Sequence, residues 1–118
     1  MRFYLILLFS FCSVSCFGED FAKIFTKGYQ FYARGDYPSA IEMFKQIPKS
    51  QHQLYEQSLF YLGSIYAYQG DKKAFEILKE AVTTTLDISM RRTAFNAFAR
   101  YCIANKKYKE IVDVSAMS

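Results

Sequence analysis

Apolar residues recur at helical spacing along most of the chain, and short polar turns separate the runs. Gly35-Asp36 and Gly70-Asp71 each divide two such runs. Glycine readily adopts the left-handed conformation that ends a helix, and aspartate favours the cap of the helix that follows. The pattern therefore predicts antiparallel helix pairs joined by tight turns. The helices are expected near residues 19–34, 37–47, 52–69, 72–84, 88–104 and 107–115.

The expected turns return at a fixed spacing. Gly35, Gly70 and Asn105 lie 35 residues apart, and so do Gly28 and Gly63 within the preceding helices. A glycine inside a helix costs ~1 kcal/mol relative to alanine, so this second pair predicts places where helices approach closely. A period of this length is typical of stacked helical hairpins, with an ordinary helical bundle of accidental spacing as the alternative.

These residues resemble the tetratricopeptide repeat family, whose pattern is a large apolar residue, Leu-Gly, an aromatic residue, alanine and a second aromatic residue. The residues that carry the resemblance are Ile24, Gly28, Phe31, Ala40 and Phe44 in the first unit, Leu59, Leu62, Gly63, Tyr66, Ala74 and Leu78 in the second, and the degenerate Ala94, Ala97, Phe98 and Tyr101 in the third. The resemblance implies an all-α fold, a right-handed stack of about three hairpins that forms an α-solenoid. The repeats would span about residues 21–50, 56–85 and 91–116.

The N-terminus has the pattern of an export signal. Arg2 is followed by a nearly unbroken apolar run over residues 3–11, and small residues precede Cys16. This run is shorter than the ~20 apolar residues that a membrane-spanning helix needs. We therefore expect residues 1–18 to be a signal peptide and residues 19–118 to form one helical domain. The alternatives are an uncleaved anchor or a buried first helix.

The stretch SVSC at residues 13–16 resembles a bacterial lipobox. That resemblance implies a lipid on Cys16 and a periplasmic or membrane-anchored lipoprotein. Plain secretion, or cleavage after Gly18, is the alternative.

Resemblance to the repeat family also implies that the first helix of each pair lines a concave groove. The groove residues expected from it are Phe25, Tyr29, Tyr32, Phe60, Ser64, Tyr68, Arg92 and Phe95. Within this set Phe25, Phe60 and Phe95 recur every 35 residues. Two interpretations of the column stay open. Phenylalanine is usually buried in a core, but an aromatic stripe can also receive an extended or helical peptide.

Composition and charge narrow the function further. Hydrophobic residues make up 52% of the chain, unlike a disordered protein, and the net charge of +4 is too dispersed to predict nucleic-acid binding. His52 has no neighbouring cysteine or histidine, and the chain has no phosphate loop or zinc-protease motif. We therefore expect no catalytic residues, no metal, no cofactor and no enzyme activity. Cys102 lies in an apolar helical pattern and is predicted to be a small buried side chain.

The sequence thus favours a protein-binding adaptor or scaffold of the cell envelope, which would hold a partner peptide or helix in an aromatic groove. The alternative is a structural subunit that completes a larger helical-repeat assembly or a homo-oligomer. Exposed phenylalanines in the column would favour the adaptor. Buried phenylalanines together with a bare C-terminal face would favour the structural subunit. Apolar Ile111, Val112 and Val114 predict association of the last helix with a partner or a second copy.

Overall fold

The structure is a computed structural model, and it describes residues 17–117. Within these residues it is all-α, with no strand. The helices are α2 (Phe17–Arg34), α3 (Tyr37–Lys45), α4 (His52–Tyr68), α5 (Lys73–Thr84), α6 (Ile88–Ala104) and α7 (Tyr108–Met117). Each expected helix is confirmed, and its ends shift by at most two residues. The predicted signal peptide lies almost wholly outside the described residues, as does Cys16, so export and lipidation stay predictions.

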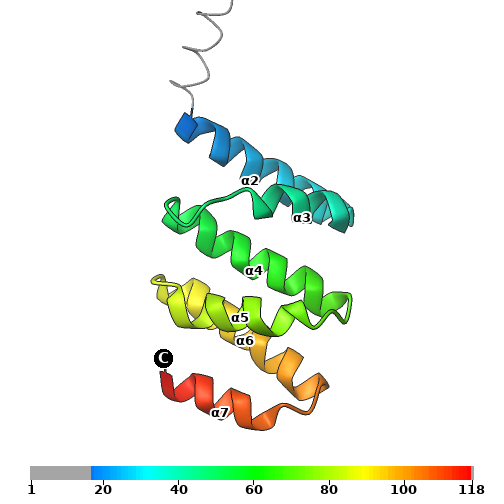
Figure 1. Cartoon of the computed structure of the whole chain (residues 1–118), viewed down its shortest axis with the longest axis vertical. Helices are drawn as coiled ribbons and strands as arrows, with labels where there is room; N and C mark the ends of the chain where they lie inside the picture. Colours follow the sequence, from blue (N-terminus) through cyan, green and yellow to red (C-terminus); the bar gives the residue numbers. More distant parts are fainter. Residues whose placement is uncertain (1–16, 118) are drawn as a thin grey trace, which may run out of the picture.

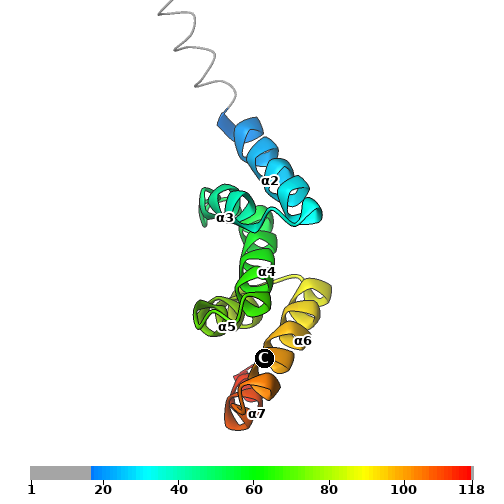
Figure 2. The same ribbon diagram turned by 90° about the vertical axis from the view of Figure 1, so that its right-hand side faces the viewer.

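The helices form a stack of hairpins that follows the order of the sequence. Each helix packs against the next one along the chain, from α2 at one end of the stack to α7 at the other (Figure 1). The first helices of successive hairpins also touch, because α4 contacts both α2 and α6. Turned by a quarter, the molecule shows α3 and α5 on one side of the stack and α2 and α6 on the other (Figure 2). The predicted stack of hairpins is therefore confirmed.

The turns inside the hairpins share one geometry. Gly35 and Gly70 have positive φ angles of 81° and 70°. The next residue in each turn, Asp36 or Asp71, donates its backbone N–H to a carbonyl five residues earlier, at 2.9 and 2.8 Å. This bond is the mark of a Schellman motif, which satisfies the free carbonyls at a helix end.

The third turn is one residue later than predicted, so the expectation for Asn105 is wrong. Asn105 has a φ of −105°, and Lys106 takes the left-handed position with a φ of 57°. The Lys107 N–H then donates to the Cys102 carbonyl at 2.7 Å, which repeats the bond of the other two turns. Asn105 is still helical in its bonding, since its backbone N–H donates to the Tyr101 carbonyl at 3.1 Å, and its side-chain amide donates to the same carbonyl at 2.8 Å. The first helix of this hairpin, α6, therefore ends one residue later than the 35-residue spacing predicts.

Aspartate side chains accept backbone hydrogen bonds at the start of three helices, as the N-cap of α3 and α6 and one residue before the N-cap of α5. Asp36 accepts from the backbone N–H of Ser39 at 3.3 Å, and Asp71 accepts from that of Lys73 at 2.9 Å. Asp87 caps α6 by accepting from the Met90 N–H at 2.8 Å. These carboxylates satisfy N–H groups that a helix start otherwise leaves unpaired, so the turns fix the direction of each following helix.

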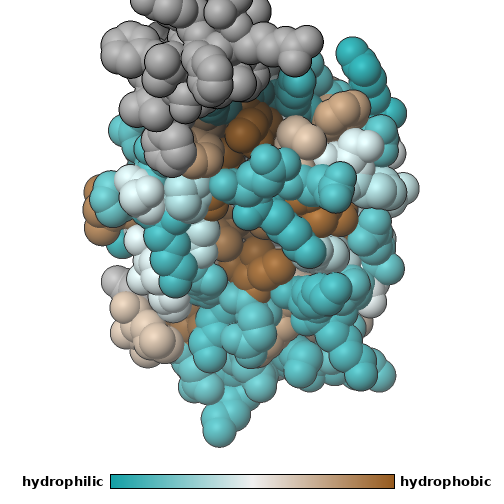
Figure 3. Space-filling model, turned by 45° about the horizontal axis from the view of Figure 1, so that its top comes forward, coloured by the Kyte–Doolittle hydropathy of each residue, from teal (hydrophilic) through white to brown (hydrophobic). Residues whose placement is uncertain are grey.

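Glycines permit the close helix contacts that their spacing predicts. A Cβ added at Gly28 would lie 2.8 Å from Cε1 of Phe44, and one added at Gly63 would collide with Leu78. Around these contacts one core runs through the hairpins, with hydrophobic surface showing between hydrophilic side chains on the face drawn in Figure 3. Its fully buried large side chains include Phe44, Ile65, Leu78, Val82, Phe98 and Val114.

Candidate partner-binding surface

The aromatic residues of α2 and α4 gather around Tyr61, which sequence reasoning missed. Its ring lies 5.1 Å from that of Tyr32 and 5.7 Å from that of Tyr29, measured between ring centroids. It stacks on Phe44 at 5.4 Å, with only 11° between the ring planes. The 35-residue register could not reveal this residue, because Thr26 and Asn96 hold the equivalent positions in the other units.

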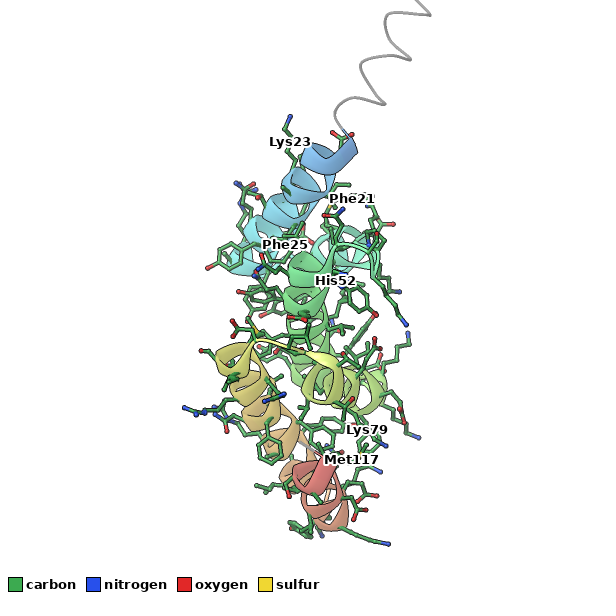
Figure 4. The ribbon with its side chains drawn as sticks, turned by 90° about the vertical axis from the view of Figure 1, so that its left-hand side faces the viewer. Phe21, Lys23, Phe25, His52, Lys79 and Met117 are labelled. Atoms are coloured by element: carbon green, nitrogen blue, oxygen red, sulfur yellow. The ribbon has the colours of Figure 1, made fainter. Side chains whose placement is uncertain are left out.

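The first two phenylalanines of the predicted column belong to this aromatic cluster. Phe25 lies where α2 approaches α4 (Figure 4), with its ring 6.1 Å from Tyr61, and Phe60 lies 5.3 Å from the same ring. Both side chains are half-buried and pack against the core, and so is Tyr32. Phe25 and Tyr32 therefore join the first hairpin to the second through Tyr61, whereas Phe60 is the neighbour of Tyr61 on the same helix. Burial, then the neighbouring tyrosines, raises the pKa of the Tyr61 phenol.

Tyr29 and Tyr68 are the predicted groove residues with the most exposed rings, at 47% and 78%. The Tyr68 ring makes an edge contact of 5.5 Å with Tyr37, and Tyr37 in turn lies 6.0 Å from Tyr32. A row of tyrosines thus leads from α2 over the start of α3 to the end of α4. The ring of Tyr68 is held on one side and open on the other.

On its open side Tyr68 lines a cleft between α4 and α6, called here the α4–α6 cleft. Its volume is about 310 Å³. The lining residues are Ser64, Ala67, Tyr68, Ala97, Arg100, Tyr101, Ala104 and Asn105. Sequence reasoning found Ser64 and Tyr68 but missed Arg100. The available signal was its spacing of three residues from Ala97, which places both on the side of α6 that faces α4.

Arg92 and Phe95 do not belong to this cleft. With Ile88, Arg91 and Val82 they line a separate shallow pocket of about 190 Å³. The stripe of Ile88, Arg91, Arg92, Phe95 and Ile103 on α6 is called here the open face of α6. The eight predicted groove residues are therefore divided between the aromatic cluster, the α4–α6 cleft and this open face.

The Tyr55 hydroxyl and the Cys102 thiol both lie within the packing between helices. Tyr55 on α4 donates its hydroxyl to Glu80 on α5 at 2.7 Å. Burial, followed by this bond and the charge of Glu80, raises the pKa of Tyr55 to about 12. Cys102 is buried, as predicted, and burial raises the pKa of its thiol, which is opposite to what a nucleophile needs. Between residues 17 and 117 no group of three or more histidine, cysteine or acidic side chains could hold a metal ion.

The predicted C-terminal association surface is smaller than expected on α7 itself. Val114 is only 1% exposed and belongs to the core, whereas Val112 is 66% exposed. Ile111 packs partly against the core. Exposed apolar side chains at this end are shared between α7, with Tyr108, Val112 and Met117, and α6, with Ile88 and Ile103.

None of the helices described, α2 to α7, combines the length and apolarity needed to cross a bilayer. Comparison of the chain with models of protein families, with curated proteins and with solved structures gives no match. The resemblance to tetratricopeptide repeats therefore has its support in the chain's own residues and in its stack of hairpins.

Proposed function

We propose that the chain is an exported protein-binding module of the tetratricopeptide type, an adaptor or scaffold of the cell envelope. It holds a peptide or helix of a partner protein against the first helices of its hairpins. The observation that carries this proposal is the α4–α6 cleft, where the exposed ring of Tyr68 stands opposite Arg100 over a floor of small side chains.

The chemistry of the cleft suits a peptide. Tyrosine and arginine are the side chains that most often anchor protein interfaces, because each combines apolar area with hydrogen-bonding groups. Ala67, Ala97 and Ala104 leave space between the two helices for partner side chains. The Arg100 guanidinium offers planar donors for a peptide carbonyl or carboxylate. Contact with Tyr37 limits the rotation of the Tyr68 ring, so less conformational entropy is lost on binding.

The proposed location comes from the sequence. Arg2 and the apolar run over residues 3–11 support export, and Cys16 is the proposed site of lipid attachment. A lipid anchor one residue before α2 would hold the stack at a membrane surface, where its partner would be another envelope protein.

One observation favours a second function, that of a subunit in a larger helical assembly. On the open face of α6, Ile88 is 66% exposed and Ile103 is 55% exposed. In this case the bare end of the stack would bind a neighbouring subunit, and the α4–α6 cleft would bind nothing.

The test is capture of partners by the tagged full-length chain from its native membrane, read by mass spectrometry. Tyr68→Ala and Arg100→Ala should each reduce recovery of the main partner about tenfold, as expected for interface anchors. Both side chains are exposed, so far-UV circular dichroism should be unchanged.

Tyr108→Ala is the matched control, because Tyr108 is an exposed tyrosine, at 58%, outside the cleft. Full recovery with both cleft variants would overturn the groove proposal. Loss of the partner with Ile88→Asp alone would then favour the subunit. The same mass spectrum reports whether Cys16 carries a lipid.

A further inference from the structure

The open face of α6 is a stripe that the other described helices cover only in part. Ile88, Phe95 and Ile103 are spaced by seven and eight residues, which places them on one side of the helix. Ile88 and Ile103 are 66% and 55% exposed, and Phe95 is half-buried. Arg91 and Arg92 flank the first half of the stripe.

In the first two hairpins, residues at the corresponding positions of the first helix face the first helix of the next hairpin. Phe25 holds the position of Phe95 two units earlier, and its ring approaches Tyr61 of α4 at 6.1 Å. Tyr68 holds the position of Ile103 one unit earlier and lines the cleft against α6. The open face of α6 is therefore where a further helix would lie if the packing of the first two junctions continued.

The opposite end of the stack has a different surface. The outer side of α2 presents Ala22, Lys23, Thr26, Lys27 and Gln30, which are all exposed and mostly polar. Water can cover such a face at little cost. The α6 end instead exposes isoleucine side chains, whose contact with water is unfavourable. The two ends therefore differ, and burial against a partner lowers the free energy mainly at the α6 end.

The open face also has a defined pocket and a charge. Val82, Ile88 and Phe95 line a hollow of about 190 Å³, and Arg91 and Arg92 form its rim. Within α6 there are three arginines and no aspartate or glutamate. The hollow has room for one large apolar side chain, and its rim favours carboxylates on the neighbouring turns of a bound helix.

We propose that the open face of α6 docks an acidic amphipathic helix of a partner protein, in the position of a further first helix. An apolar side chain of that helix enters the pocket, and its flanking glutamates or aspartates pair with Arg91 and Arg92. This site lies apart from the α4–α6 cleft and shares no lining residue with it.

The positive charges of α6 disfavour a second copy of this chain as the occupant of the open face. If two copies met through α6, the interface would contain Arg91 and Arg92 from each copy. No carboxylate within α6 would be available to pair with these four arginines. Stacking head to tail instead brings Lys23 and Lys27 of one copy, offset only in part by Asp20, towards the arginines of the other. Both arrangements juxtapose like charges, which disfavours association.

The experiment measures binding of a designed helical peptide to the full chain, held in a nanodisc of uncharged lipid, by fluorescence anisotropy. The peptide has about the length of α6, with leucines at helical spacing and glutamates on both flanks. A matched peptide carries lysine in place of every glutamate. We expect the acidic peptide to bind about tenfold more tightly than the basic one.

Two variants and a control locate the site. Arg91→Glu combined with Arg92→Glu should weaken the acidic peptide about tenfold and strengthen the basic one, because both rim charges reverse. Ile88→Asp should weaken the acidic peptide without unfolding the stack, since Ile88 is exposed. Arg100→Glu, on another side of the same helix, should leave this binding unchanged while it abolishes capture at the α4–α6 cleft.

Three outcomes would overturn the proposal. Equal binding of both peptides, or indifference to the double reversal, would mean that no charged docking site exists. Crosslinks between copies through α6 that Ile88→Asp removes would make a second copy the occupant. Vesicles of anionic lipid that bind through Arg91 and Arg92, with no peptide binding, would make the face a membrane contact.

Discussion

Gly63→Ala tests whether close helix contact explains the internal glycines. Gly63 lies in α4 and faces α5, and a Cβ at this position would lie 2.6 Å from Cγ of Leu78 and 3.4 Å from Cγ2 of Ile77. Leu78 is fully buried at 0% exposure, so its side chain has no free space into which it could turn. The added methyl group must therefore push α4 and α5 apart or strain the leucine.

Two opposing effects set the magnitude. Alanine is favoured over glycine inside a helix by ~1 kcal/mol. Overpacking a well-filled core costs about 1–3 kcal/mol, and here the collision is with a side chain that cannot move. We expect overpacking to win, with a net loss of roughly 1 kcal/mol in the free energy of unfolding.

The sign should reverse when the obstacle is removed. Leu78→Ala alone should cost about 2–5 kcal/mol, because it leaves a cavity beside Gly63. Adding Gly63→Ala to that variant should restore about 1 kcal/mol, since the methyl group then enters the cavity and the helix preference is gained. The double-mutant cycle should therefore give a coupling energy of roughly 2 kcal/mol.

The assay is denaturant unfolding of the four proteins of the cycle, followed by far-UV circular dichroism. If Gly63→Ala stabilises the chain while Leu78 is present, the contact is loose and the explanation is wrong. Gly28→Ala provides a parallel case, because a Cβ there would lie 2.8 Å from Cε1 of Phe44 and 3.1 Å from Cβ of Met43. It should also destabilise the protein.

Two further predictions concern a turn and a hydrogen bond. Gly35→Ala should cost about 1 kcal/mol and Lys106→Gly should gain a similar amount, because both positions are left-handed and only glycine adopts that conformation freely; equal unfolding midpoints for the two variants would refute this. Tyr55→Phe should cost about 1 kcal/mol by removing the bond to Glu80. Because folding raises the pKa of Tyr55 from 10.0 to about 12, this contribution is full below pH 10.0 and is lost as the pH rises towards 12. The difference in melting temperature between wild type and variant should shrink over that window, and a constant difference would contradict the assignment.

The fold could be predicted because its information is local. Gly35 and Gly70 end helices through their own backbone freedom, and Asp36, Asp71 and Asp87 each accept a backbone hydrogen bond at a helix start from within three residues along the chain. The third turn was misplaced by one residue because no glycine marks it. There the backbone bonds of the turn hold Lys106 in a conformation that its side chain disfavours.

The candidate site was harder to predict because it depends on which side of each helix meets a neighbour. The phenylalanine column was found, but Phe25 reaches Tyr61 on the next first helix and Phe60 packs against the core, so both are half-buried. Tyr61 has no counterpart at the same register, and Arg100 acquires meaning only when α6 lies beside α4. These positions are defined by contacts between hairpins. A periodic sequence pattern gives the average repeat and does not identify the individual residues that make those contacts.

The uneven use of tyrosine makes the two contacts between successive first helices different in composition. Between the first two hairpins Tyr61 is wedged among rings of both, whereas Asn96 holds the equivalent place in α6 and is exposed. The second hairpin holds the third mainly through α5, where the Phe75 and Phe98 rings lie 5.6 Å apart. A ligand can therefore enter between α4 and α6 without parting stacked rings, whereas entry between α2 and α4 would have to break them.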